Sequence, residues 1–251
     1  ARGGGESGGE QSPPPPAAAP LAQSTLQDAL PVLQTLSTAY HSLALQCLET
    51  LRLEVLVRAV LYVRQLEGPY VFLRVEQQRE ADASVVALLK FATQTEEEVS
   101  PFLPPYKRAY LFGTLPSISA ECMMRALPGI SEINGIGVKR ICNDCVALQQ
   151  GLVPLGSRDA YGSTVSVEAT RTLERLGSKR RVTVALASFE RVQKYYQLLS
   201  LSVETLLGYV EDHPLSFHAT EYAALLGVHV PGRQVTESQR GRLIQLLATR
   251  G

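Results

Sequence analysis

Large apolar residues recur at helical spacing over residues 42 to 68, "SLALQCLETLRLEVLVRAVLYVRQLEG". Most of the arginine and glutamate residues of this segment lie off the apolar line, which is typical of an amphipathic helix. Gly68-Pro69 then ends the pattern. The spacing predicts one long helix whose buried stripe consists of Leu43, Cys47, Leu51, Val55, Leu61 and Leu66.

Capping signals predict further helices along the rest of the chain. The expected N-terminal caps are Asp82, Ser117, Asn134, Ser202 and a capping box formed by Thr236 and Gln239. The helix after Asp82 should end before Pro101, and its glutamates 96 to 98 should form a solvated run that frays or pairs with a basic group. Gly227 should follow a short helix as its C′ residue.

No pair of alternating strands is visible in the sequence. The aromatic segment at residues 106 to 116, "YKRAYLFGTLP", is short and isolated, so we expect a connector that packs on the bundle. Helices joined by mostly short turns predict an all-α class of consecutive antiparallel bundles.

Composition limits the classes of partner and the number of folded parts. The chain has 251 residues, an apolar fraction of 45%, and 24 basic against 24 acidic residues, so it lacks the global positive charge that nucleic-acid binding favours. Residues 1 to 22 are rich in Gly, Pro, Ser and Ala and predict a disordered segment before a helical region at 23 to 251. Residues 156 to 181 read as an exposed insertion within that region.

The chain shows no targeting or membrane signal. The uncharged stretch from Ala29 to Leu48 is long enough to span a membrane, but it contains Pro31 and many Gln, Ser and Thr residues, which are costly in hydrocarbon. No basic segment followed by an apolar one marks a secretory signal. Four cysteines in a chain of this length favour a reducing compartment over a disulfide framework.

The segment "NGIGVKRICNDC" at residues 134 to 145 contains two features associated with chemistry. Its glycines do not have the spacing of a phosphate-binding loop, and Lys139 is not followed by Ser or Thr. We expect instead that Gly135 and Gly137 let another part of the backbone approach the first helical turn. Cys142 and Cys145 have zinc-ligand spacing, which leaves a cysteine-based zinc or redox protein as the alternative, but Cys145 falls on an apolar helical stripe and reads as a small core residue.

Beyond this segment the sequence offers no arrangement of nucleophile, acid and base, so we predict no catalytic residues, no cofactor, no metal and no small-molecule substrate. One local excess of basic residues remains. It predicts a solvated face or, as the sharper hypothesis, contact with an acidic partner or anionic lipid through Arg175, Lys179, Arg180, Arg181, Arg191 and Lys194.

Four segments resemble, in the same order, the C-terminal region of the exocyst complex component four family, the Sec-eight subunits. They are "KRAYLFG" at 107 to 113, "GIGVKRICNDCVALQQ" at 135 to 150, "YYQLLSLSVETLLGYVEDH" at 195 to 213 and "TEYAALLGVHVPGR" at 220 to 233. The last segment is the most specific. The N-terminal segment and the basic insertion have no clear counterpart in the family.

The resemblance implies a rod of stacked helical bundles and a non-enzymatic role. Exocyst subunits assemble, eight together, to tether secretory vesicles to the plasma membrane before fusion. The implied partners are the other exocyst subunits, with the sixth Sec subunit as the closest, and possible contact with anionic lipids would fit the basic residues. The implied location is cytoplasmic and peripheral to the plasma membrane at sites of exocytosis.

Overall fold

The computed structural model describes residues 20–79, 81–155 and 168–248. The chain divides into two compact units, an N-terminal unit, Ala1–Cys47, and a C-terminal unit, Leu48–Gly251. Most of the predicted disordered segment and the first part of the predicted insertion, residues 156 to 167, lie outside the described residues. Residues 20 to 22 and 168 to 181 are described, and both stretches are helical.

The described residues are predominantly helical, which confirms the all-α class. The helices are α1 (Pro20–Val63), α2 (Ala83–Val99), α3 (Pro105–Phe112), α4 (Leu115–Ala126), α5 (Gly135–Leu152), α6 (Glu168–Gln197), α7 (Val203–Asp212), α8 (Ala219–Gly227) and α9 (Glu237–Ala248). Short 3₁₀ turns are η1 (Val75–Arg79), η2 (Leu127–Gly129) and η3 (Leu198–Ser200), and two short strands are β1 (Gly68–Tyr70) and β2 (Ile130–Ile133).

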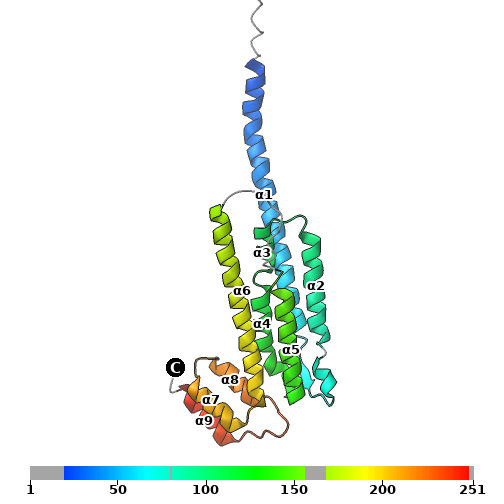
Figure 1. Ribbon diagram of the computed structural model, residues 1–251. Helices are drawn as coiled ribbons and strands as arrows, with labels where there is room; N and C mark the ends of the chain where they lie inside the picture. Colours follow the sequence, from blue (N-terminus) through cyan, green and yellow to red (C-terminus); the bar gives the residue numbers. More distant parts are fainter. Residues whose placement is uncertain (1–19, 80, 156–167, 249–251) are drawn as a thin grey trace, which may run out of the picture. The chain divides into compact units, whose positions relative to one another are not determined.

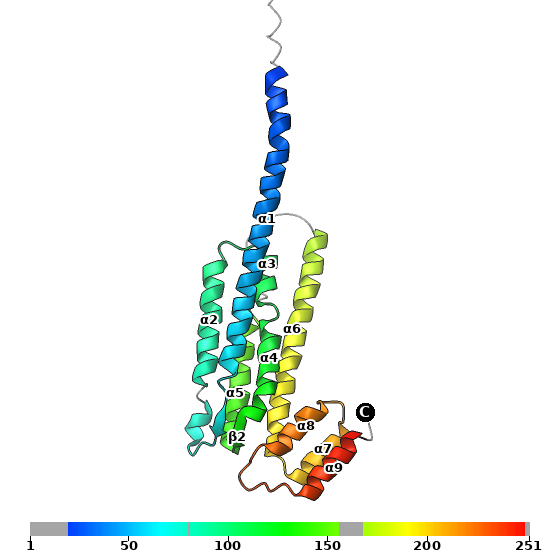
Figure 2. The same ribbon diagram turned by 180° about the vertical axis from the view of Figure 1, so that it is seen from behind.

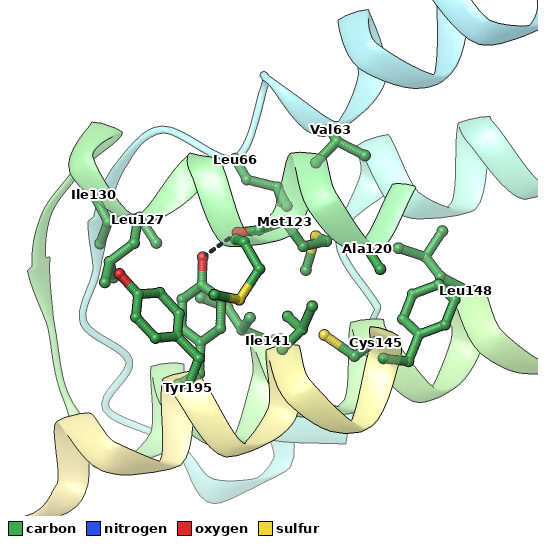
Figure 3. Close-up of a cluster of buried hydrophobic side chains, with 14 of the residues drawn as sticks. Val63, Leu66, Ala120, Met123, Leu127, Ile130, Ile141, Cys145, Leu148 and Tyr195 are labelled. Carbon is green, nitrogen blue, oxygen red and sulfur yellow. Dashed lines mark hydrogen bonds between the residues drawn. The ribbon is translucent and has the colours of Figure 1, made fainter. Parts of the chain in front are cut away.

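In the C-terminal unit, the last turns of α1 run lengthwise with α2, α4, α5 and α6 as one bundle (Figures 1 and 2). The core of this bundle consists of fully buried aliphatic, aromatic and sulfur-containing side chains (Figure 3). The buried Tyr196 hydroxyl of α6 donates to the Met123 carbonyl of α4 at 2.8 Å, and the Tyr195 hydroxyl donates to the Glu221 carbonyl of α8 at 2.9 Å, so both hydroxyls are satisfied.

The three C-terminal helices form a second, smaller group at one end of α6 (Figure 1). Ser202 caps α7 as predicted, because its hydroxyl accepts from the Thr205 N–H at 3.2 Å. The predicted capping box is also confirmed, since the Thr236 N–H donates to Gln239 Oε1 at 2.9 Å and the Gln239 N–H donates back to Thr236 Oγ1. Stacked helix groups, as predicted, therefore make up this unit.

The segment "HVPGR" folds as a tight turn between α8 and α9. The Arg233 N–H donates to the Val230 carbonyl at 2.9 Å, with Pro231 and Gly232 at the two central positions. Gly232 has φ of +81°, which a type II turn requires and which glycine adopts without strain. The Arg233 guanidinium donates to the carbonyls of Leu225 and Val228, where α8 leaves carbonyls unpaired.

A parallel strand pair is the element that the sequence did not predict. Gly68 lies opposite Ile130, and Tyr70 opposite Ile133. Gly68 has φ of +96°, so the glycine that ends the α1 pattern also turns the chain into β1. Strands of three and four residues are too short to show alternation in a sequence.

Several predicted boundaries and burial assignments were wrong. Residues 106 to 112 of the expected connector belong to the helix α3, and residues 115 and 116 begin α4. Thr114 rather than Ser117 precedes α4, and Gly227 is the last residue of α8, with an extended Val228 as its C-cap. Glu96 is only 3% exposed and pairs with Arg108, so it belongs to no solvated run, although the predicted pairing with a basic group is confirmed. Leu43 and Leu61 are both 55% exposed and Cys47 is exposed as well, whereas Val55 and Leu66 are buried as predicted. The buried stripe of α1 is completed by Leu48, Ala59 and Val63.

Candidate interaction surfaces

The start of α5 shows what the two glycines of the "NGIGVKRICNDC" segment do. Asn134 caps the helix as predicted, and its Oδ1 accepts from the Gly137 N–H at 2.9 Å. A side chain at Gly137 would collide with the Tyr70 carbonyl, whereas a side chain at Gly135 would meet open space. The predicted close approach of another backbone is therefore confirmed at Gly137 and wrong at Gly135. This stretch therefore packs the start of α5 closely against β1.

A buried polar cluster fixes the segment after β1 to α5. The Arg140 guanidinium lies 2.9 Å from Asp82 Oδ1, and the Tyr70 hydroxyl donates to Asp82 Oδ2 at 3.0 Å. The Asp82 N–H donates to Asp144 Oδ1 at 2.9 Å. These contacts explain why Asp82, at the N-cap of α2, makes no side-chain capping hydrogen bond.

Asp144 is fully buried beside a second carboxylate. Its Oδ2 has no hydrogen-bond partner among the described residues. Desolvation and the neighbouring Asp82 carboxylate together raise the pKa of Asp144 to about 8. The side chain is therefore mostly protonated at neutral pH, and Arg140 balances the single negative charge on Asp82.

The cysteine pair lies inside the bundle. Cys145 is fully buried and packs beside Ile141, Leu148 and Ala120 (Figure 3), which confirms its prediction as a core residue. Cys142 is half-buried, with its Sγ 3.9 Å from the Gln193 carbonyl of α6. Desolvation raises the pKa of Cys142 to about 11 and raises that of Cys145 further above its ordinary value. Both thiols are therefore protonated at neutral pH, which opposes thiolate chemistry.

The part of the chain that the structure describes brings no three His, Cys, Asp or Glu side chains together in a way that could hold a metal ion. Nor is any described helix sufficiently long and apolar to cross a membrane. The zinc or redox alternative thus gains no support from the surroundings of Cys142 and Cys145.

The predicted basic cluster is spread along α6. Lys179, Arg180 and Arg181 are exposed, whereas the side chain of Arg175 lies outside the described part of the helix. Arg191 and Lys194 lie roughly 15 Å or more further along the helix, because each residue advances the axis by about 1.5 Å. The six residues are therefore spread along one helix, and their contact with an acidic partner or anionic lipid stays a prediction.

Arg191 has a structural role. Its guanidinium lies 2.6 Å from Glu221 Oε2 of α8 and stacks 5.0 Å from the centre of the Phe217 ring. The Glu221 carboxylate also accepts from the His218 N–H at 2.7 Å, at the start of α8. Arg191 thus joins α6 to the C-terminal helices. Lys194 is exposed and its Nζ lies 5.3 Å from the centre of the Tyr209 ring, so residues 179 to 181 and Lys194 are the exposed cations among the predicted residues whose side chains are described.

A groove between α1 and α4 is the surface best suited to another protein. Its volume is about 550 Å³, and Val60, Ile118, Cys122 and Ala126 provide apolar lining. Charged side chains of both signs surround this lining, namely Arg64, Glu67, Glu121 and Arg125. An apolar floor with a charged rim has the composition of a protein interface.

The exposed side of α1 extends this groove. Leu53, Val57 and Leu61 are 62%, 51% and 55% exposed and follow one another at intervals of four residues. We call these three residues with the groove lining the α1–α4 surface. The opposite side of the same helix carries the buried stripe, so α1 is apolar on two sides, which is typical of a helix between two layers. Sequence periodicity detected the helix but could not separate the side that faces the core from the side that remains open.

The described residues define an all-α helical-bundle protein, with Cys145 in its core and apolar side chains exposed along α1. The Arabidopsis thaliana protein "Exocyst complex component SEC8" is 30% identical over 216 residues, which cover 86% of this chain and 18% of the relative. The Homo sapiens protein "Exocyst complex component 4" is 25% identical over 205 residues, covering 81% of this chain and 18% of the relative.

These matches confirm the resemblance seen in the sequence: the chain is a homologue of the exocyst component 4, or SEC8, proteins. The Mus musculus relative covers a similar share, with 27% identity over 237 residues. The chain spans about a fifth of the length of the curated relatives it matches. No protein-family model matches the chain.

Proposed function

We propose that this chain is part of an exocyst subunit that tethers secretory vesicles to the plasma membrane before fusion. The observation that carries the proposal is its homology, over most of its length, with exocyst components of a plant and of animals. Its place of action would be the cytoplasmic face of the plasma membrane, as a peripheral protein at sites of exocytosis.

The mechanism is non-enzymatic and depends on helical binding surfaces. The α1–α4 surface would receive a helix of another exocyst subunit, with the sixth Sec subunit as the first candidate. Its apolar floor favours burial, because each square ångström of apolar surface removed from water contributes about 25 cal/mol. The mixed charges of its rim favour one orientation and one partner over others.

The direct test uses the chain as bait for purified exocyst subunits. We expect capture of at least one subunit, and a Val57→Glu substitution should weaken it because a charge would enter the apolar stripe. Val184→Glu on α6 is the matched control, since Val184 is 50% exposed and Val57 is 51% exposed. Capture of no subunit would count against the exocyst proposal, and equal loss in both variants would count against this surface.

Binding of anionic lipid is a second candidate function. It is favoured by the exposure of Lys179, Arg180 and Arg181 in consecutive positions of α6. A basic residue near an anionic membrane contributes about 1 kcal/mol, so three residues can support weak, salt-sensitive binding. The triple Glu variant should then lose flotation with phosphatidylserine vesicles. Flotation that is unchanged in this variant would remove the lipid hypothesis.

A further inference from the structure

The exposed basic run of α6 is followed directly by a hydroxyl group. The segment "KRRVTV" at residues 179 to 184 places Arg180 and Arg181 three and two residues before Thr183, with the apolar Val184 directly after it. Protein kinases that select basic substrates recognise arginines at these two positions through carboxylates in their peptide groove, and they accept an apolar side chain after the hydroxyl. The segment therefore has the charge pattern of a phosphorylation site.

The structure leaves the groups of this pattern on the surface. Thr183 is exposed, and its Oγ1 donates to the Lys179 carbonyl at 3.0 Å, a contact within the same helix that needs no other element. Arg180 and Arg181 are exposed as well, and Val184 is 50% exposed. None of the groups that a kinase would recognise is therefore part of the core.

A kinase binds its substrate as an extended chain, so α6 must open locally around Thr183. Among the described side chains of this helix, Ala185 is the first that is buried. Residues 179 to 184 before it are exposed, except for the half-buried Val182. Opening this stretch breaks few apolar contacts, which places it at the low-stability end of the fold.

A second threonine shows how the fold can block the same pattern. Thr236 also has an arginine, Arg233, three residues before it. The Arg233 guanidinium, however, donates to two carbonyls at the end of α8, and the Thr236 hydroxyl accepts from the Gln239 N–H as part of the α9 cap. Both groups are occupied by the fold, so Thr236 does not present this pattern to another protein.

We propose that Thr183 is a phosphorylation site for a kinase of the basic-substrate class, and that its phosphate neutralises the basic run. Thr183 Oγ1 attacks the γ-phosphorus of ATP, the bond from this phosphorus to the β–γ bridging oxygen breaks, ADP leaves, and the hydroxyl proton passes to a base of the kinase. The phosphate carries about two negative charges. Once the helix forms again, Lys179 and Arg180 lie one turn away on the same face, where both can pair with it.

The effect on membrane contact rests on the lipid binding proposed above for residues 179 to 181, whereas the modification site does not. A basic residue near an anionic membrane contributes a factor of about five in affinity, so neutralisation of two should weaken binding about 25-fold. Phosphorylation thus acts as an electrostatic switch that releases this part of α6 from anionic lipid.

The first measurement is phosphate incorporation into the native chain by the catalytic subunit of cyclic-AMP-dependent protein kinase with MgATP, mapped by peptide mass spectrometry. We expect phosphate on Thr183 and loss of most incorporation in Thr183→Val. Arg180→Gln should slow incorporation at least about tenfold, because the kinase loses a charge-assisted pair. Arg74→Gln removes an exposed arginine elsewhere and should leave the rate unchanged. An unmodified Thr183, modification mainly at another residue, or equal rates for Arg180→Gln and wild type would overturn the site.

The second measurement is flotation with vesicles that contain phosphatidylserine, before and after kinase treatment. The phosphorylated chain should bind about 25-fold more weakly, whereas kinase-treated Thr183→Val should bind as before. Equal flotation of the modified and unmodified chains would overturn the switch. If the unmodified chain does not float, the lipid hypothesis fails and the switch with it, while the peptide masses still decide the site.

Discussion

Replacement of Asp144 by asparagine should change how the stability of the fold depends on pH. The pKa of this buried carboxyl is about 8 in the folded chain and near its ordinary value of 3.8 in the unfolded chain. Between these two values the folded state holds a proton that the unfolded state has released. Stability must therefore fall as pH rises from about 4 to about 8, and the loss is complete above the folded pKa.

The magnitude follows from the same two values. Each pH unit inside the window costs about 1.4 kcal/mol, so the wild-type chain should lose on the order of 3–4 kcal/mol of unfolding free energy between pH 4 and pH 7 through this group alone. Asparagine reproduces the protonated carboxyl: its oxygen can accept from the Asp82 N–H, and its amide can donate toward the Asp82 carboxylate. Asp144→Asn should remove the loss and be the more stable chain at pH 7.

Urea unfolding followed by far-ultraviolet circular dichroism at pH 5, 6, 7 and 8 measures the effect. Asp212→Asn is the matched control, because it removes one carboxylate from an exposed position of α7 and should leave the pH dependence unchanged. A constant difference between wild type and Asp144→Asn over this range would refute the reasoning, since it would mean that Asp144 does not hold a proton in the folded chain.

Four further substitutions, of which Gly135→Ala is a control, test the packing of the bundle. Gly137→Ala should lower the unfolding free energy by about 2–4 kcal/mol, because its methyl group would collide with the Tyr70 carbonyl. Gly135→Ala should be neutral or slightly stabilising, since its methyl group would meet open space. Equal effects of the two substitutions on chemical denaturation would contradict this account. Tyr196→Phe should cost about 1–2 kcal/mol in the same assay, because a buried carbonyl of α4 loses its donor, and an unchanged midpoint would show that water replaces it. Cys145→Ser should cost about 1–3 kcal/mol, since a hydroxyl would enter the apolar core, and a variant as stable as wild type would place the thiol outside that core.

Local signals predicted the parts of this fold that neighbouring residues decide. Asn134 and Ser202 cap their helices because a short polar side chain reaches a free N–H three residues later, and this geometry needs no tertiary contact. Asp82 shows the limit of the same rule. It occupies the N-cap position of α2, but Arg140 and Tyr70, which lie far away in sequence, take both of its carboxylate oxygens.

The remaining features depend on contacts that a sequence pattern does not contain. The burial of Glu96 could not be inferred, because its position among three glutamates suggests a solvated surface. Its compensating partner Arg108 approaches from a different helix, α3. The strand pair β1–β2 was missed for a related reason. Its stability comes from pairing segments about 60 residues apart, and each segment alone is too short to show a period.

Apolar side chains lie on two sides of α1, and one of these sides is buried while the other is exposed. Val55 and Ala59 are fully buried, while Leu53, Val57 and Leu61 on the same helix are more than half exposed. Both sets are apolar and both recur at helical spacing, so periodicity assigns them to one core. The structure shows that the first set is buried and the second is exposed. The exposed set needs a separate explanation, because apolar side chains that remain in water do not stabilise the fold. In a homologue of exocyst subunits the simplest cause is a second layer of helix that covers α1. Val57→Glu should then weaken binding of that helix, because the charge would be buried, whereas Val184→Glu should leave binding unchanged.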